Sequence, residues 1–481
     1  MSRLRVLLAN VAAVVSGKAV AAVAGLATIM VLTRHLGPQE FGYYRTVLTY
    51  SGFAAVLADC GIYMVTLREM SRPGAIPSQV LGTALPLRFA STMGVLILAS
   101  VLVWGLPYDR VVKWGIPIGA GVYTCAQVSE LLVAVFQSVS RQGRNAIAEA
   151  GGAIASLAAV WILATMHGGA LAMLGATLFG CALALTISWR LARRLVPFHI
   201  NFDMQRWRAY IVLGLPIAGS QILTMAILRG DSLILSLFQP ATAVGLYGVS
   251  TKLFELATSL AFMFGGLMMP SLTAAAAMPN RENFPRVLGH TMDTAVIYGI
   301  GAVLALAPFA PQILSLVAGP AFAAGSPALI VISFAIGIAA LSHVLRFALV
   351  ACDRPRFVLK ADAVACGVGF AAYFALIPRF SILGAAIGTV VAESCSLVGM
   401  LRGLRLAGQR IPSLLNFAKA LGAGGIALGC VTLCNQFDVP WILALVLGGA
   451  VYLGVLALTH AIPPELLAAV FRRRDSYQGS A

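Results

Sequence analysis

The sequence predicts an all-α polytopic membrane protein with about fourteen transmembrane helices, arranged as two six-helix bundles plus a C-terminal helix pair. The chain of 481 residues is 60% hydrophobic and 10% charged, with a mean hydropathy of +0.91. Soluble domains are roughly 45–50% apolar and about 25% charged. Apolar runs of about 20 residues, long enough to cross a ~30 Å hydrocarbon core, recur along the chain.

The apolar runs lack the ten-residue alternation of a transmembrane β-barrel, so helices are expected. The expected spans are residues 8–32, 42–66, 82–105, 114–138, 146–166, 168–189, 209–237, 244–270, 291–309, 328–350, 358–378, 383–402, 414–434 and 440–461. The first run resembles a signal peptide. Lys18 interrupts it and apolar segments continue after it, so a retained first helix is expected.

The basic residues between the runs predict the orientation of the chain. Segments expected on the cytoplasmic side hold 22 Lys and Arg residues, whereas the outer loops hold four: Arg34, Arg110, Lys113 and Arg379. Because cytoplasmic loops carry an excess of Lys and Arg, both termini should be cytoplasmic and the number of spans even. The net charge of +16 is thus largely explained by topology, and no nucleic-acid partner is expected.

The longest cytoplasmic connection divides the chain. We expect an N-terminal six-helix bundle over residues 1–189, a basic linker over 190–208, a second bundle over 209–403, and a final helix pair with a cytoplasmic tail over 404–481. The linker, "RLARRLVPFHINFDMQRWR", is rich in arginine and aromatic residues. It could lie on anionic headgroups as an amphipathic segment or serve as a solvated linker.

Two outer loops repeat a short pattern. In "LTRHLGPQEFGYY" Pro38 is followed by Gly42 and Tyr44, and in "LFQPATAVGLYG" Pro240 is followed by Gly245 and Tyr247. Each loop joins the first and second spans of one bundle. The spacing of six spans predicts a parallel repeat, related by an axis along the membrane normal.

Ionisable residues deep in apolar spans are costly, so they mark candidate functional positions. The candidate cations for an anionic substrate are Lys18, Arg229 and Lys252, and the candidate ion-coupling or pairing carboxylates are Asp59, Glu130, Asp231 and Glu393. Lys252 and Glu255 are three residues apart and can neutralise each other on one helix face. Buried ion pairs that only orient helices are the alternative. Cations nearer the span ends are expected to reach the headgroups: Arg45, Arg88, Arg346 and Lys419; Asp362 is similarly shallow.

Sequence motifs for enzymatic chemistry are absent. There is no G-x-x-x-x-G-K-[ST] phosphate loop, and the six histidines form no H-E-x-x-H pattern. The eight cysteines show no C-x-x-C spacing. We therefore expect no catalytic residues, no metal and no cofactor.

The run from Gly25 to Arg72 resembles the N-terminal signature of the polysaccharide transporter family, whose members are lipid-linked oligosaccharide flippases of the multidrug/oligosaccharidyl-lipid/polysaccharide exporter superfamily. The matching elements are Arg34-x-x-Gly37-Pro38, Glu40-Phe41-Gly42-x-Tyr44, Asp59-x-Gly61, Arg68-Glu69 and Arg72. Asp231, Gly245-x-Tyr247 and Lys252-Leu253 also resemble the seventh and eighth spans of that family.

The resemblance implies two six-helix bundles in a V shape that alternate their opening across a bacterial plasma (inner) membrane. It implies a polyprenyl-diphosphate-linked oligosaccharide as substrate, for O-antigen, capsule or exopolysaccharide synthesis. It also implies membrane lipids as partners, together with a polysaccharide polymerase and chain-length machinery. Two alternatives stay open: a proton- or sodium-coupled exporter of small organic cations, and a membrane-embedded glycan polymerase or ligase.

Overall fold

The computed structural model describes residues 3–72, 74–139, 141–277, 283–409, 415–459 and 461, and within these ranges it contains helices and no strand. The helices are α1 (Arg3–Asp59), α2 (Ile62–Met70), α3 (Pro77–Leu102), α4 (Arg110–Ser138), α5 (Gly143–Thr165), α6 (Ala170–Leu195), α7 (Met204–Phe238), α8 (Ala241–Ala277), α9 (Phe284–Leu306), α10 (Ala310–Ala318), α11 (Ser326–Ala351), α12 (Pro355–Leu406), α13 (Leu415–Gln436) and α14 (Trp441–Leu458). Short 3₁₀ helices occupy Val103–Gly105 and Pro320–Gly325. The basic residues Arg281, Arg410 and Arg472 to Arg474 lie outside the described ranges.

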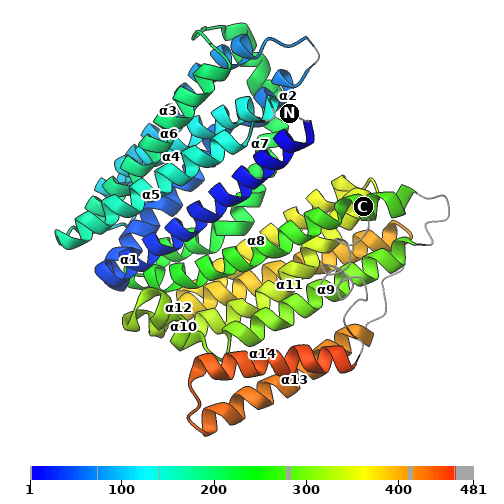
Figure 1. The fold of residues 1–481 in the computed structure, drawn as a ribbon. Coiled ribbons are helices and arrows are strands. Elements are labelled where there is room, and N and C mark those ends of the chain that lie inside the picture. The colour runs from blue at the N-terminus through cyan, green and yellow to red at the C-terminus, as the bar shows by residue number, and fades with distance from the viewer. Residues whose placement is uncertain are drawn as a thin grey trace, which may run out of the picture. The chain divides into compact units, whose positions relative to one another are not determined.

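Helix α1 reverses its direction at Gly37. This glycine has φ 66°, and Pro38 follows it. Before the reversal, Gly17 packs on Ala146 at the start of α5, and His35 bonds to the Gly168 carbonyl just beyond the end of α5. After it, the chain runs along α4. Since α4 and α5 are consecutive antiparallel helices, the two halves of α1 are antiparallel and correspond to the first two expected spans (Figure 1).

Helix α12 folds back on itself in the same manner. Its non-helical residue is Ser381, with φ 51°. Glycines after Ser381 contact residues that lie nearly as many positions before it. Gly384 contacts Leu376, Gly388 contacts Tyr373, and Gly399 contacts Ala361. The eleventh and twelfth expected spans are therefore the two arms of a tight helical hairpin.

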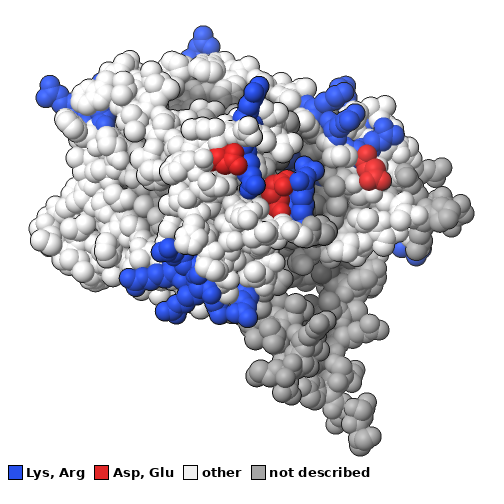
Figure 2. Space-filling view, turned by 90° about the horizontal axis from the view of Figure 1, so that it is seen from above, with Lys and Arg blue, Asp and Glu red and all other residues white. Residues whose placement is uncertain are grey.

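Each of the fourteen expected spans falls largely on a described helix, which confirms the predicted fold class. Twelve of the described helices are long and apolar enough to cross a membrane, and α1 and α12 each contain two of the expected spans. Many large apolar side chains on these helices are exposed, among them Trp161, Leu267 and Leu458. On the face shown in Figure 2, most of the described surface is uncharged, and Lys and Arg cover more of it than Asp and Glu. Such an apolar exterior is expected of a protein surrounded by lipid.

The chain forms two compact units. Unit 1 comprises Met1–Gly248 with Val317–Ala321, and unit 2 comprises Val249–Leu316 with Phe322–Ala481. Unit 1 therefore contains α1 to α7 and the start of α8, whereas the rest of α8 and the later long helices belong to unit 2. The domain boundaries expected from the sequence stay a prediction.

The two segments with the matching pattern pack against each other within unit 1. A Cβ atom on Gly42 would lie 1.8 Å from the Ala241 carbonyl oxygen, and one on Gly245 would lie 1.9 Å from the Pro38 carbonyl oxygen. Gly42 thus packs next to Pro240 of the second segment, and Gly245 packs on Pro38 of the first. This reciprocal contact is typical of a two-fold relation and supports the predicted repeat.

The linker between α6 and α7 is attached to the start of α3. The Asn201 amide donates to the Gly82 carbonyl (3.0 Å), and the Trp207 indole donates to the Thr83 carbonyl (3.0 Å). Phe198 is buried, while Ile200 and Phe202 are exposed. The segment is therefore fixed and largely extended before α7. Its contact with lipid headgroups stays a prediction.

Candidate functional site

The candidate site is built at a break between α1 and α2. Cys60 and Gly61 have positive φ values of 47° and 71°, so the chain leaves the helical path directly after Asp59. The Gly61 amide donates to the Asp59 carboxylate (3.2 Å). A Cβ atom on Gly61 would lie 2.5 Å from the Gly214 carbonyl oxygen of α7, so both the backbone angles and the close approach require glycine here.

Arg88 of α3 holds this break together. Its side chain is 0% exposed and forms ion pairs with Asp59 and with Glu130 of α4, the latter at 3.0 Å. It also donates to the backbone carbonyls of Asp59 (3.3 Å) and Gln127 (3.4 Å), and to the Gln127 side chain. The guanidinium group thereby satisfies a carbonyl exposed by the helix break and neutralises one carboxylate beside it.

A cavity of about 300 Å³ with both polar and apolar side chains in its lining opens beside Arg88. It is lined by Val56, Asp59, Gln127, Glu130, Gln221, Thr224, Met225 and Leu228, which come from α1, α4 and α7 of unit 1. The Glu130 side chain is 51% exposed, and the Gln221 Oε1 atom is buried without a hydrogen-bond partner in the described part of the chain. Glu130 is therefore the lining carboxylate most open to a ligand, and Gln221 adds an enclosed acceptor without a partner.

The prediction that Arg88 reaches the headgroups is wrong. It assumed that the third helix begins with its apolar run at residue 82, but α3 begins at Pro77. Arg88 therefore lies eleven residues, or about 16 Å, along the helix. Counting residues from Pro77 instead of from residue 82 would have placed Arg88 deep in its helix.

The structure brings Asp59 and Glu130 together through Arg88, but it places the other predicted residues of unit 1 elsewhere. Lys18 is exposed on the first arm of α1, and no ion pair of the described residues includes it. Arg229 is partly buried and follows Leu228 of the cavity lining. Asp231 is buried and accepts a hydrogen bond from the Tyr247 hydroxyl (2.6 Å), so two residues of the recognised pattern join α7 to α8.

Two sets of charges lie in unit 2. Lys252 and Glu255 form the predicted ion pair on α8, at 3.0 Å. Arg346 of α11 pairs with Asp362 of α12 through both of its terminal nitrogens. The expectation that Arg346 extends to the headgroups is therefore wrong, because a carboxylate on the next helix binds it. Glu393 lies in the second arm of α12.

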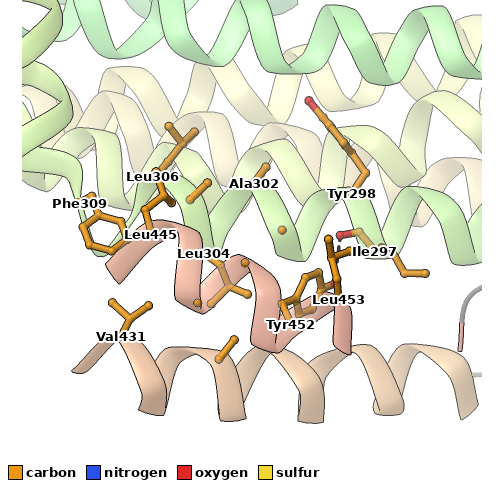
Figure 3. A pocket seen from close by; sticks show the side chains of 15 residues that line it. Ile297, Tyr298, Ala302, Leu304, Leu306, Phe309, Val431, Leu445, Tyr452 and Leu453 are labelled. Carbon is orange, nitrogen blue, oxygen red and sulfur yellow. Dashed lines mark hydrogen bonds between the residues drawn. The ribbon is translucent and has the colours of Figure 1, made fainter. Parts of the chain in front are cut away.

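A large apolar cavity of about 530 Å³ lies between α9, α13 and α14 of unit 2. Figure 3 shows Leu304 of α9, Val431 of α13 and Leu445 of α14 around it. The Tyr452 hydroxyl donates to the Ile297 carbonyl (3.0 Å). Apart from the tyrosine hydroxyls, the side chains that line this cavity are apolar, so it suits a hydrocarbon group.

The fold and the site define a multi-pass α-helical membrane protein with an ionic cavity inside its helices. Residues 7–275, more than half of the chain, match the model of the family described as polysaccharide biosynthesis protein. The chain therefore belongs to this family. A search of curated proteins found no match.

Solved structures share the fold at low sequence identity. The lipid II flippase MurJ, in an inward closed conformation, is 12% identical with a TM-score of 0.80, covering 94% of this chain and 99% of that one. An inward-facing multidrug resistance MATE family transporter of the MOP superfamily is 14% identical with a TM-score of 0.65, covering 81% and 94%. A MOP superfamily transporter from Pyrococcus furiosus is 14% identical with a TM-score of 0.54, covering 84% and 95%.

Proposed function

We propose that this protein is a non-enzymatic flippase that moves polyprenyl-diphosphate-linked oligosaccharides across the bacterial plasma membrane by alternating access, with both termini cytoplasmic. The observation that carries the proposal is the presence of two kinds of cavity among membrane-spanning helices. The cavity beside Arg88 has two carboxylates and two amides in a mixed lining, whereas the lining of the cavity between α9, α13 and α14 is almost entirely apolar. A substrate with a sugar head and a hydrocarbon tail needs both kinds.

The carboxylate and amide side chains of the cavity beside Arg88 suit sugar hydroxyls. A hydroxyl group both donates and accepts hydrogen bonds, so it can donate to the Glu130 carboxylate and to the unpartnered Gln221 Oε1 atom. Arg88 is completely enclosed and engaged with Asp59, so it positions this lining and does not bind the substrate itself. Lys18 and Arg229 are the cations that we assign to the diphosphate, and Lys252 with its partner Glu255 is a weaker candidate.

Family membership supports the biological role. The matched model describes polysaccharide biosynthesis, and the structure of highest TM-score quoted above is of a flippase for lipid II. A polysaccharide polymerase and chain-length machinery would then receive the flipped product. We infer no catalytic step, because transport of a finished lipid-linked unit requires no covalent change.

The test is flipping by the purified full chain in proteoliposomes. The probe is a polyprenyl-diphosphate-linked sugar with a fluorophore on the sugar, which dithionite bleaches only in the outer leaflet. The chain should make the inner-leaflet pool accessible. Lys18→Ala and Arg229→Ala should each lower the rate by about tenfold, the effect of losing ~1.4 kcal/mol of binding to a charged group. Lys360→Ala, at an exposed lysine near the start of α12, is the matched control and should keep the rate.

Export of small organic cations is the second candidate. The observation in its favour is the charge of the ionic set in unit 1, where one arginine faces two carboxylates. Efflux of ethidium from the same vesicles, lost in Glu130→Gln, with no flipping of the lipid-linked probe, would establish this function in place of the first. Flipping without ethidium efflux would exclude it.

A further inference from the structure

A further cavity, with a predominantly polar wall, lies in unit 1 near the reversal of α1. Its volume is about 310 Å³, at the lower end of the range for small-molecule sites. The wall comes from the second arm of α1, the segment before α4, the end of α7 and the start of α8. Its polar lining residues are Tyr43, Thr46, Tyr108, Asp109, Ser236 and Gln239.

Asp109 supplies the charge of this cavity, whose lining contains no Lys, Arg or His. It directly precedes α4, a position where aspartate usually accepts hydrogen bonds from the first helix amides, but here its side chain makes no such bond. The carboxylate accepts instead from the Tyr43 hydroxyl, which itself accepts from the Gln39 amide (3.1 Å). Asp109 is exposed and belongs to no ion pair of the described residues, so its carboxylate can accept further hydrogen bonds.

Aromatic side chains complete the wall. Tyr108 is buried, with its hydroxyl 2.9 Å from the Ser236 hydroxyl, whereas Phe238 is 49% exposed. A sugar ring has hydroxyls at its edge and an apolar face of C–H groups, so it can bind a carboxylate at the edge and pack its face on an aromatic ring. A diphosphate or an acidic sugar does not suit this cavity, because the charged group in the lining is itself negative.

This cavity is separate from the one beside Arg88. Tyr43 and Asp59 line the two cavities from the same arm of α1, sixteen residues apart, which corresponds to about 24 Å along the helix. In Figure 1, α2 and the start of α1 mark one end of unit 1, and the reversal of α1 lies at the other. The distribution of Lys and Arg along the sequence assigns the end with the reversal to the outer side of the membrane.

We propose that this cavity is a saccharide site on the outer side of the membrane, which holds an uncharged sugar ring of the lipid-linked substrate after it has crossed. Two neighbouring hydroxyls of the ring donate to Asp109, and its apolar face packs on Phe238. Unit 1 then binds the sugar at both ends, through Glu130 and Gln221 before transport and through Asp109 after it. The assignment to the transported sugar rests on the proposed function, whereas the binding of a sugar does not.

Sugar binding is tested with the full chain in fluorescent lipid nanodiscs on an array of neutral and acidic bacterial oligosaccharides. The wild type should bind glycans that expose an uncharged ring with two adjacent hydroxyls. Asp109→Asn should weaken this binding by about tenfold or more, because the sugar loses hydrogen bonds to a charged acceptor. Phe238→Ala should weaken it several-fold. Binding no stronger than that of empty nanodiscs, or binding to acidic glycans alone, would overturn the proposal.

The matched controls are Asp438→Asn and Phe437→Ala. These two exposed residues are neighbours between α13 and α14 of unit 2, and they line neither cavity at which we place a sugar. Both variants should bind glycans as the wild type does. Glu130→Gln separates the two sugar sites. Binding that is lost in Glu130→Gln and kept in Asp109→Asn would place the sugar in the cavity beside Arg88 and overturn the proposal.

The outer position is tested by cysteine labelling of intact cells with a membrane-impermeant maleimide. Asp109→Cys should react from outside, above the background that the native cysteines give in the wild type. Asp353→Cys, at an exposed residue between α11 and α12 on the side expected to be cytoplasmic, should react only after the cells are permeabilised. Reaction of Asp109→Cys only after permeabilisation would overturn the outer site.

The link to transport is tested in the proteoliposomes with the fluorescent lipid-linked probe. Asp109→Asn should lower the flipping rate several-fold, and Asp438→Asn should keep it. An unchanged rate in Asp109→Asn would overturn the assignment of this site to the transported sugar. Absence of flipping by the wild type would instead refute the proposed function, while the array would still decide whether the cavity binds a sugar.

Discussion

Replacing Arg88 by methionine should destabilise the protein far more than neutralising Glu130, although both residues belong to one ionic group. Methionine keeps much of the volume of the arginine and removes its charge. The Asp59 side chain is 7% exposed and would be left as a buried carboxylate without its counter-ion, whereas Glu130 is 51% exposed. Breaking a buried pair by removing one partner costs about 3–5 kcal/mol. An exposed pair contributes about 0.2–1 kcal/mol.

We therefore expect Arg88→Met to lower the free energy of unfolding by about 3–5 kcal/mol and Glu130→Gln by no more than about 1 kcal/mol. The measurement is denaturant unfolding of the purified chain in mild detergent, followed by tryptophan fluorescence. The double variant Arg88→Met/Asp59→Asn should recover about half of the loss, because no uncompensated charge is then buried. Equal costs for Arg88→Met and Glu130→Gln, or no recovery in the double variant, would refute the reasoning.

Three other substitutions have defined outcomes. Gly42→Ala should lower the midpoint of thermal unfolding strongly, since its Cβ would lie 1.8 Å from the Ala241 oxygen, whereas Gly25→Ala, with no atom within 4 Å, should leave the midpoint unchanged or raise it. Tyr247→Phe removes the donor to the buried Asp231 carboxylate and should lower the free energy of unfolding by about 1–3 kcal/mol. Tyr63→Phe, which removes a partly buried hydrogen bond to Gln137, is the control, and an equal or larger loss in that variant would contradict the prediction. Burial raises the pKa of Tyr108 to about 12, although Ser236 hydrogen-bonds to it, so the unfolded chain loses this proton first as the pH rises above 10. The wild type should then lose up to about 3 kcal/mol between pH 10 and pH 12 relative to Tyr108→Phe, and parallel stability curves of the two proteins would contradict this.

The span pattern could be predicted because it depends on one property, the length of apolar runs. The breaks between apolar runs also located the reversals at Gly37 and Ser381, although the run lengths do not show that the helix folds back there. At Gly37 the glycine-proline pair marks the turn in the sequence. At Ser381 the turning residue itself is neither glycine nor proline, and the short break "PRFS", which begins with Pro378, separates the two arms.

The candidate site was harder to predict because a partner cannot be identified from depth alone. The apolar runs identify Asp59 and Glu130 as deep carboxylates, but they place the common partner Arg88 near a span end, within reach of the headgroups. The polar residues at the start of α3 are helical as well, so the apolar run begins later than the helix does. Arg346 shows the second limit, since its partner Asp362 belongs to another helix and no local spacing connects the two.

The pattern Asp59-x-Gly61 thus has a structural explanation: its residues build the helix break, and other residues of the cavity lining determine which sugar can bind. Gly61 allows the chain to turn and to approach Gly214, and Asp59 binds the arginine that fills the break. None of these groups is free to select a sugar. Glu130 and Gln221 line the same cavity with unused hydrogen-bonding capacity, so substitutions at such positions would alter the lining without disturbing the helix break. A fixed helix break with a variable lining would let one fold carry different oligosaccharides.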